Sequence, residues 1–208
     1  MNLTIVYKIL FTVFTYLFGA FPTAYIIYKL KKGGDIRKEG SGNVGGTNVT
    51  RTIGPAAGVG TIPILILYFI FPEDLILLAA VTVIAVLGHD YPVYLKFKGG
   101  KGISTSFGVM VGLCSLPFFG FENALWLRIL PPFLILFTWL IVFLASRIVS
   151  LSSLVAAIAT PLSFYFTKYP LPIVIAAICL SILTFIAHRD NIKRLIKGEE
   201  KKIKRKGA

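Results

Sequence analysis

Seven long runs of apolar residues, separated by short polar segments, limit what this 208-residue chain can fold into. A helix needs roughly 20 apolar residues to cross about 30 Å of hydrocarbon. Only 15% of the residues are charged, whereas soluble domains carry about a quarter. The sequence therefore predicts an all-α integral membrane protein with seven transmembrane helices. The predicted helices cover Ile9–Tyr28, Gly54–Phe71, Leu75–Leu87, Ile103–Phe119, Ile129–Ala145, Val149–Phe166 and Leu171–Ala187.

The basic residues are distributed unequally between the two sides of these predicted helices. Nineteen of the 22 Lys and Arg residues lie in every second connecting segment and in the C-terminal tail, and three lie in the others. Cytoplasmic loops of membrane proteins carry such an excess of positive charge. This pattern predicts an N-terminus outside, a C-terminus in the cytoplasm, and a single polytopic domain over residues 1–208. The first run is interpreted as a retained helix, because no clear signal-peptide cleavage site follows it.

The remaining composition excludes several other classes of protein. Cys114 and Cys179 both lie in apolar runs, which indicates buried thiols rather than a disulfide scaffold. The basic tail over residues 189–208 is typical of a segment that lies on anionic lipid. No nucleic-acid partner is predicted, because no aromatic platform or binding fold accompanies the tail.

The first cytoplasmic loop is rich in glycine and hydrogen-bonding side chains, over residues 40–51. Glycines let backbone N–H groups converge on an anion, and an arginine offers a planar fork that fits phosphate. A flexible turn that caps the next helix remains the alternative. The candidate binding residues in this loop are Gly40, Ser41, Gly42, Asn43, Gly45, Thr47, Asn48 and Arg51.

The second cytoplasmic loop reads Gly99-Gly100-Lys101-Gly102 before a predicted helix. A lysine and unpaired backbone N–H groups at the positive end of a helix can bind an anion. The loop is not a Walker A motif, because Gly102 stands where Ser or Thr is required and no strand precedes it. A basic turn without a ligand remains the alternative, and His89 is interpreted as structural, hydrogen-bonded beside the turn at Pro92.

Two shorter polar clusters lie at the ends of later helices. Ser150 opens the sixth predicted helix, where it either caps that helix or contributes to a site. His188 and Asn191 follow the seventh helix, three residues apart on one face if the helix continues. A histidine there could serve as a base, bind an anion or do neither.

All four polar clusters are predicted on the cytoplasmic side, and nearly all of their side chains suit an anion. Carboxylates are scarce there and show no metal-binding spacing, which argues against a Mg²⁺-dependent phosphatidyltransferase. No nucleophile elbow is present, so a covalent acyl-enzyme is not expected.

In order and spacing, these four windows resemble the membrane acyl-phosphate:glycerol-3-phosphate acyltransferases of bacteria. The resemblance is carried by Gly40-Ser41-Gly42-Asn43, Gly45, Thr47-Asn48, Arg51, Gly88-His89, Tyr91-Pro92-Val93, Phe97-Lys98-Gly99-Gly100-Lys101-Gly102, Ser150-Leu151, His188-Arg189-Asp190-Asn191-Ile192, Arg194-Leu195 and Gly198.

The resemblance implies transfer of an acyl group from acyl phosphate to position 1 of glycerol 3-phosphate, which gives lysophosphatidate and phosphate. It also implies a cytoplasm-facing site in the bacterial inner membrane, with no metal, coenzyme A or acyl carrier protein. On this basis Ser41, Lys101, His188 and Asn191 are the expected catalytic residues. Ser41, Arg51, Lys101, His188 and Asn191 are expected to bind glycerol 3-phosphate. Asn43, Thr47 and backbone N–H groups of both glycine loops are expected to hold the acyl phosphate.

This chain departs from the family pattern mainly in the second predicted helix. Residues 60–68 lack the Asp-x-x-Lys-Gly run that many members carry, and Asp90 and Lys96 replace commoner apolar or small residues. A transporter for small organic phosphates and a non-catalytic binding paralogue are therefore kept as alternatives. A transporter usually shows internal repeats and a midplane site, and the sequence indicates neither.

Overall fold

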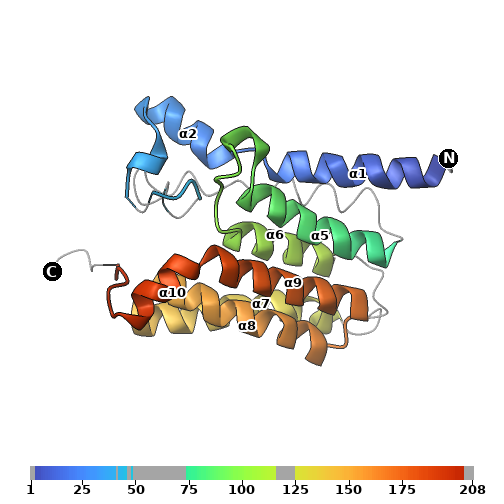
Figure 1. Cartoon of the computed structure of the whole chain (residues 1–208). Coiled ribbons are helices and arrows are strands. Elements are labelled where there is room, and N and C mark those ends of the chain that lie inside the picture. The colour runs from blue at the N-terminus through green and yellow to red at the C-terminus, as the bar shows by residue number, and fades with distance from the viewer. Residues whose placement is uncertain (1–2, 41, 46–47, 49–73, 116–124, 204–208) are drawn as a thin grey trace. The chain divides into compact units, whose positions relative to one another are not determined.

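The computed structural model describes residues 3–40, 42–45, 48, 74–115 and 125–203. Every regular element in these ranges is helical, as predicted (Figure 1). Contacts within the chain divide it into two units, residues 1–116 and 117–208. The two units are described separately.

The first unit contains α1 (Leu3–Gly19), α2 (Thr23–Lys32), α5 (Leu75–Asp90) and α6 (Ile103–Ser115). Two short 3₁₀ helices, η1 (Ile36–Lys38) and η3 (Val93–Leu95), lie in its two polar loops. The first predicted helix is interrupted between α1 and α2 because Pro22 has no N–H group and restricts the residue before it.

Helices α1 and α5 pack side by side (Figure 1), and their backbones approach closely at Gly19 and Gly88. A Cβ on Gly88 would overlap the carbonyl oxygen of Tyr16 and lie 2.9 Å from the N atom of Ala20. A Cβ on Gly19 would overlap the carbonyl oxygen of Ala85. The Tyr16 hydroxyl also donates to the carbonyl oxygen of Tyr91 at 2.7 Å. These contacts fix α1 against the end of α5 from which the second polar loop leaves.

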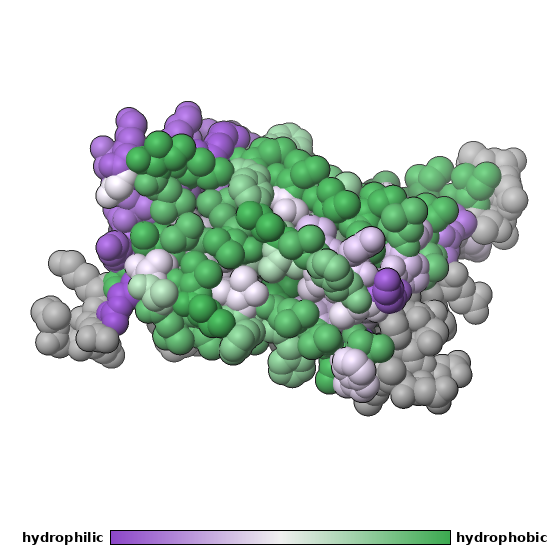
Figure 2. Space-filling model, turned by 90° about the horizontal axis from the view of Figure 1, so that it is seen from below, coloured by the Kyte–Doolittle hydropathy of each residue, from purple (hydrophilic) through white to green (hydrophobic). Residues whose placement is uncertain are grey.

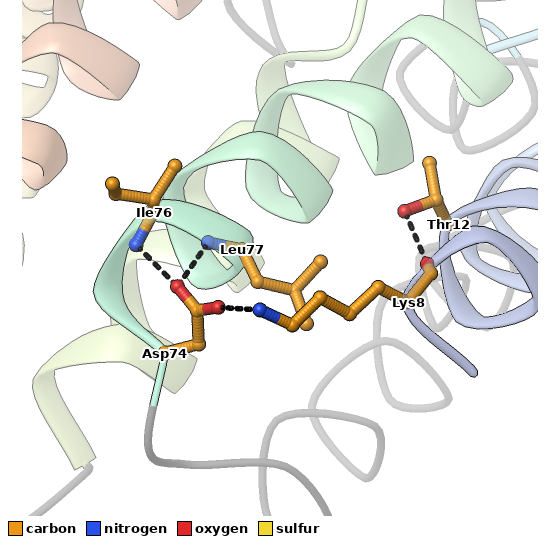
Figure 3. Close-up of polar contacts among 5 residues, drawn as sticks. All are labelled: Lys8, Thr12, Asp74, Ile76 and Leu77. Carbon is orange, nitrogen blue, oxygen red and sulfur yellow. Dashed lines mark hydrogen bonds and ion pairs between the residues drawn. The ribbon is translucent and has the colours of Figure 1, made fainter. Parts of the chain in front are cut away.

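The opposite end of α5 is held by Asp74 (Figure 3). One carboxylate oxygen of Asp74 accepts hydrogen bonds from the backbone N–H groups of Ile76 and Leu77, at 3.1 and 3.0 Å. The other accepts from Lys8 Nζ at 2.6 Å. The hydrogen bond from Lys8 is the main reason that the pKa of the Asp74 carboxyl lies below its ordinary value. One side chain therefore caps α5 and pairs it with α1.

We expect Asp74→Ala to destabilise the protein more than Lys8→Ala. Both side chains of the ion pair are about half exposed or less, and such pairs contribute roughly 0–1 kcal/mol. Loss of the cap costs about 1 kcal/mol in addition. Thermal unfolding of the two variants in one detergent measures the difference. A larger decrease in unfolding temperature for Lys8→Ala than for Asp74→Ala would contradict the capping role of Asp74.

The second unit contains α7 (Leu125–Ser146), α8 (Val149–Phe166), α9 (Leu171–Ala187) and α10 (Arg189–Ile196). Helix α8 packs against both α7 and α9. At one turn, Trp139 Nε1 on α7 donates to Ser153 Oγ on α8 at 3.3 Å. Near the C-terminal end of α8, the hydroxyl of Tyr169 donates to the carbonyl oxygen of Arg128 on α7 at 2.8 Å.

Several of these helices have the length and apolarity of membrane spans. Within the described residues, four segments qualify, and the bent pair α9–α10 would make a fifth. On α7 the large apolar side chains of Trp126, Phe133 and Leu144 are all more than 60% exposed. Figure 2 shows that apolar residues cover most of one face. Large exposed apolar patches are rare on soluble proteins, so this surface indicates contact with lipid.

The observed helices agree closely with part of the predicted set. Helices α8 and α9 have the predicted bounds, whereas α5 continues three residues beyond Leu87. The predicted helix Gly54–Phe71 lies outside the described residues, as does the end of Ile103–Phe119. The number of seven spans and their orientation therefore remain predictions.

Candidate functional site

The first polar loop begins with a compact ion pair. Asp35 caps η1 by accepting from the backbone N–H of Arg37, and its carboxylate also accepts from Arg37 Nε and Nη2 at 2.6–3.0 Å. The bonds from the Arg37 guanidinium lower the pKa of Asp35 to about 2. Arg37 also lies over the ring of Tyr25, 5.7 Å from its centroid. The pair therefore stays charged at neutral pH and fixes the start of the loop on α2.

Two asparagines hold the body of the same loop. Asn48 is only 2% exposed, and its side-chain N–H₂ donates to the carbonyl oxygens of Glu39 and Asn43 at 3.0 and 2.9 Å. Asn43 Oδ1 accepts from the backbone N–H of Gly45 at 2.7 Å. Asn48 thus closes the loop from inside, and the described bonds of the Asn43 amide use its oxygen only.

The second polar loop folds back onto the last turn of α5. The N–H groups of Gly99 and Gly100 donate to the carbonyl oxygens of Asp90 and His89, both at 3.1 Å. In the first loop, the N–H of Gly42 similarly donates to the carbonyl oxygen of Glu39. The expectation that the N–H groups of both glycine loops face a ligand is therefore not met at these positions. The loops use these donors to close themselves.

The two loops approach each other at their glycines. A Cβ built on Gly45 would lie 3.8 Å from the Cα of Gly100. On the other side of Gly100, a Cβ would overlap the imidazole of His89 and lie 2.7 Å from its Cδ2 atom. His89 is thus structural, as expected, but it acts by packing its ring against the loop. The two loops also share a small buried cluster, made of Tyr28, Ile36, Val44 and Leu95.

This packing presents Lys101 and the start of α6 at the junction of the loops. Gly102 is buried with a φ of 61°, and a Cβ there would lie 2.6 Å from Val86. The first helical hydrogen bond runs from the N–H of Ser106 to the carbonyl oxygen of Gly102. The N–H groups of the first turn of α6 therefore have no partner within the helix, and they give this end a partial positive charge. Together with Lys101, they can bind a phosphate.

Three of the candidate residues lie outside the described part of the chain. These are Ser41, Thr47 and Arg51. Residues 60–68, where the charged run of many family members is missing, are outside it as well. Gly40 and Gly42 border Ser41 and have positive φ angles of 59° and 73°.

In the second unit, a single carboxylate gathers three polar side chains. Glu200 Oε1 accepts from Ser150 Oγ at 2.8 Å and from Asn191 Nδ2 at 2.6 Å. Glu200 Oε2 accepts from Arg194 Nε at 2.7 Å. The capping role considered for Ser150 is wrong, because α8 begins at Val149 and Ser150 lies inside the helix.

The chain returns to this cluster through a tight turn after α10. Gly198 has a φ of 71°, and the N–H of Glu199 donates to the carbonyl oxygen of Arg194. Farther on, the N–H of Ile203 donates to the carbonyl oxygen of Arg147 at 2.9 Å. Burial raises the pKa of the Glu200 carboxyl, but its three hydrogen bonds outweigh this effect, so that the pKa is lowered. Glu200 therefore acts as a charged acceptor.

Sequence reasoning did not identify Glu200 as part of a site. It identified Ser150 and Asn191 by their positions at helix ends, and Arg194 only through the resemblance. The spacing of Asn191 and Arg194 places both on one face of α10. Together with the glycine at 198, that spacing was the available signal for an acceptor just beyond the helix.

We expect Glu200→Ala to lower the stability of the protein, whereas Glu199→Ala leaves it unchanged. Removal of Glu200 leaves two buried donors, on Ser150 and Asn191, without their acceptor, and each unsatisfied buried group costs about 1–3 kcal/mol. Glu199 is the matched control because it is exposed. Equal thermal unfolding temperatures for the two variants in detergent would contradict this role.

His188 lies at the bend between α9 and α10 and is 3% exposed. Its Nδ1 atom is 2.8 Å from the carbonyl oxygen of Thr184. Because a carbonyl oxygen only accepts, Nδ1 must carry the hydrogen, and Nε2 is the basic nitrogen of the neutral ring. The geometry suits a base whose orientation is fixed by the preceding helix.

Comparison with known proteins gives one consistent result. Residues 9–198 match the family model described as glycerol-3-phosphate acyltransferase. The glycerol-3-phosphate acyltransferase of Aquifex aeolicus is 40% identical over 204 residues, which cover 93% of this chain and 98% of that protein. The enzyme of the same name from Endomicrobium trichonymphae is 39% identical, over 95% of this chain and 96% of its own.

Two solved structures are similar to this chain over nearly its whole length. Both are crystal structures of PlsY, an integral membrane glycerol 3-phosphate acyltransferase. The glycerol 3-phosphate form has a TM-score of 0.80 at 36% identity and covers 95% of this chain and 96% of that one. The lysophosphatidic acid form has a TM-score of 0.78 at 35% identity and covers 95% of each chain.

Proposed function

Since the chain belongs to the glycerol-3-phosphate acyltransferase family, we propose that it transfers a fatty acyl group from acyl phosphate to the 1-hydroxyl of glycerol 3-phosphate. The products are lysophosphatidate and inorganic phosphate, and the reaction belongs to phospholipid biosynthesis. The observation that carries this proposal is the match over residues 9–198, which includes all four polar windows.

The protein is embedded in a bacterial membrane, as its family and its apolar helices indicate. We place it in the inner membrane with the polar loops on the cytoplasmic side. The unequal distribution of Lys and Arg supports this orientation. Glycerol 3-phosphate would then reach the loops from the cytoplasm, and the acyl chain would lie among the helices.

In the first unit, the proposed anion receptor is Lys101 with the positive end of α6. Ser41 and Arg51 would assist in binding glycerol 3-phosphate, and Asn43 and Thr47 would hold the acyl phosphate. The closed geometry of both loops supports these roles, because a loop held by its own hydrogen bonds keeps its ligand-binding groups in place before the substrate arrives. Gly99, Gly100 and Gly102 serve by letting the backbone pack this closely.

In the second unit, His188 and Asn191 would orient the glycerol hydroxyl. That oxygen attacks the acyl carbonyl carbon, the bond between this carbon and the phosphate oxygen breaks, and inorganic phosphate leaves. The hydroxyl proton passes either to His188 Nε2 or to the phosphate of the substrate, whose second pKa is about 6. The bond from Nδ1 to Thr184 supports the first route, because it leaves Nε2 as the basic nitrogen.

The proposed chemistry needs neither a metal nor a covalent intermediate. Acyl phosphate is a mixed anhydride and already carries a good leaving group. The protein has to bring two anions together and align them, and such positioning can supply about 7–11 kcal/mol of the barrier. Lysine, arginine and the end of a helix supply the neutralising charge.

The test is phosphate release from palmitoyl phosphate by purified protein in detergent without added metal. We expect release that depends on glycerol 3-phosphate, together with formation of lysophosphatidate. If folded protein released no phosphate under these conditions, acyl transfer from acyl phosphate would be refuted. Release that did not depend on glycerol 3-phosphate would refute the proposed acceptor.

A further inference from the structure

Helix α10 has two faces of different character. Its inward face carries Asn191, 7% exposed, next to the buried His188 that precedes the helix. Its outward face carries the exposed side chains of Arg189, Lys193 and Ile196. These three positions follow the spacing of one helical face, so that the cations and the isoleucine lie together.

The direction of α10 relative to α9 places this helix near the membrane surface. Helix α9 is mostly apolar, contains no charged residue and spans about 26 Å at 1.5 Å per residue, close to the thickness of the hydrocarbon layer. The chain then bends by 62° at His188. If α9 crosses the bilayer, α10 begins at the headgroups and lies closer to the membrane plane than to its normal.

The residues after α10 extend the same basic character. Lys197, Lys201 and Lys202 are exposed. The turn at Gly198, the bonds to Glu200 and the bond from Ile203 to Arg147 hold this segment in place. The cations are therefore presented by an ordered surface.

We infer that the outward face of α10, formed by Arg189, Lys193 and Ile196, binds the headgroups of anionic phospholipids together with Lys197, which directly follows the helix. The basic side chains match the negative charge of such lipids. Ile196 is 81% exposed, and an apolar side chain between cations gains free energy when it enters the acyl boundary of a bilayer. A soluble polyanion would offer no apolar contact for Ile196, which favours lipid as the partner.

Hydrogen exchange of α10 amides in nanodiscs tests this surface. Wild-type protein is compared in phosphatidylcholine alone and in phosphatidylcholine mixed with phosphatidylglycerol. We expect exchange in α10 to be slower in the mixed lipid by about fivefold or more, since each basic residue near an anionic surface contributes roughly a factor of five. The measurement does not use catalysis, so a failure of the proposed acyl transfer would leave it interpretable.

A matched pair of variants assigns the effect to this face. Lys193→Gln/Lys197→Gln should abolish the difference between the two lipids. Lys31→Gln/Lys32→Gln removes the same charge from exposed positions on α2 and should retain the difference. Equal exchange of wild-type α10 in both lipids, or equal loss in both double variants, would overturn the inference. Added inorganic phosphate that slowed exchange as much as the anionic lipid would also overturn it.

Discussion

Lys101→Ala is expected to abolish measurable acyl transfer. The residue lies between the half-buried Gly100 and the buried Gly102, just before the positive end of α6. The backbone before it is fixed by hydrogen bonds from Gly99 and Gly100 to the last carbonyl oxygens of α5. A positive charge that is fixed in place before the reaction stabilises the transition state far more than a mobile charge does. Loss of one such stabilising group typically lowers kcat by roughly a hundredfold to a thousandfold.

The controls for this variant remove a lysine without touching the proposed receptor. Lys98→Ala changes an exposed side chain in the same loop, and Lys202→Ala changes one in the C-terminal tail. Both should retain most of the wild-type kcat/KM for glycerol 3-phosphate. Activity of Lys101→Ala equal to that of wild type would exclude the assigned role. A similar loss of activity in all three variants would indicate that the overall positive charge of the protein matters, rather than the position of Lys101.

Helix positions could be predicted from this sequence wherever apolar runs end at clear stop signals. Helices α8 and α9 have the predicted bounds because Phe166 and Ala187 are followed by polar residues. Helix α5 extends to Asp90 because the N–H of Tyr91 still reaches the carbonyl oxygen of Leu87, and only Pro92 prevents further turns. A run of apolar residues therefore gives the helix, while backbone bonds set its end.

The polar windows were predicted as binding residues, but their internal bonding was not. Glycine-rich composition alone cannot distinguish N–H groups that face a ligand from N–H groups that close the loop. The choice depends on which carbonyl oxygens the fold brings near, here those of Glu39, His89 and Asp90. Glu200 escaped prediction for the same reason, because its partners come from α8 and α10 and meet it only after the turn at Gly198.

Gly100→Ala is expected to lower kcat/KM for glycerol 3-phosphate by roughly tenfold to a hundredfold, the effect of about 1–3 kcal/mol of overpacking. The methyl group would overlap the imidazole of His89, and the nearest three atoms it meets all belong to that ring. Movement of the ring or of the loop would displace Lys101, the next residue. Activity of Gly100→Ala equal to that of wild type would show that this contact does not constrain the loop.

Removal of the His89 imidazole tests whether its overlap with the new methyl group, rather than a general folding defect, lowers the activity of Gly100→Ala. In Gly100→Ala/His89→Ala, the space of the imidazole becomes available, and the activity should return to that of His89→Ala alone. At Gly99 the obstacles include the carbonyl oxygen of Asp90, 2.6 Å from the position of a Cβ, together with that of His89. Because these atoms belong to the backbone, His89→Ala should not rescue Gly99→Ala. Rescue at 100 but not at 99 would show that the imidazole of His89 fixes the turn before Lys101, and failure at both positions would refute this.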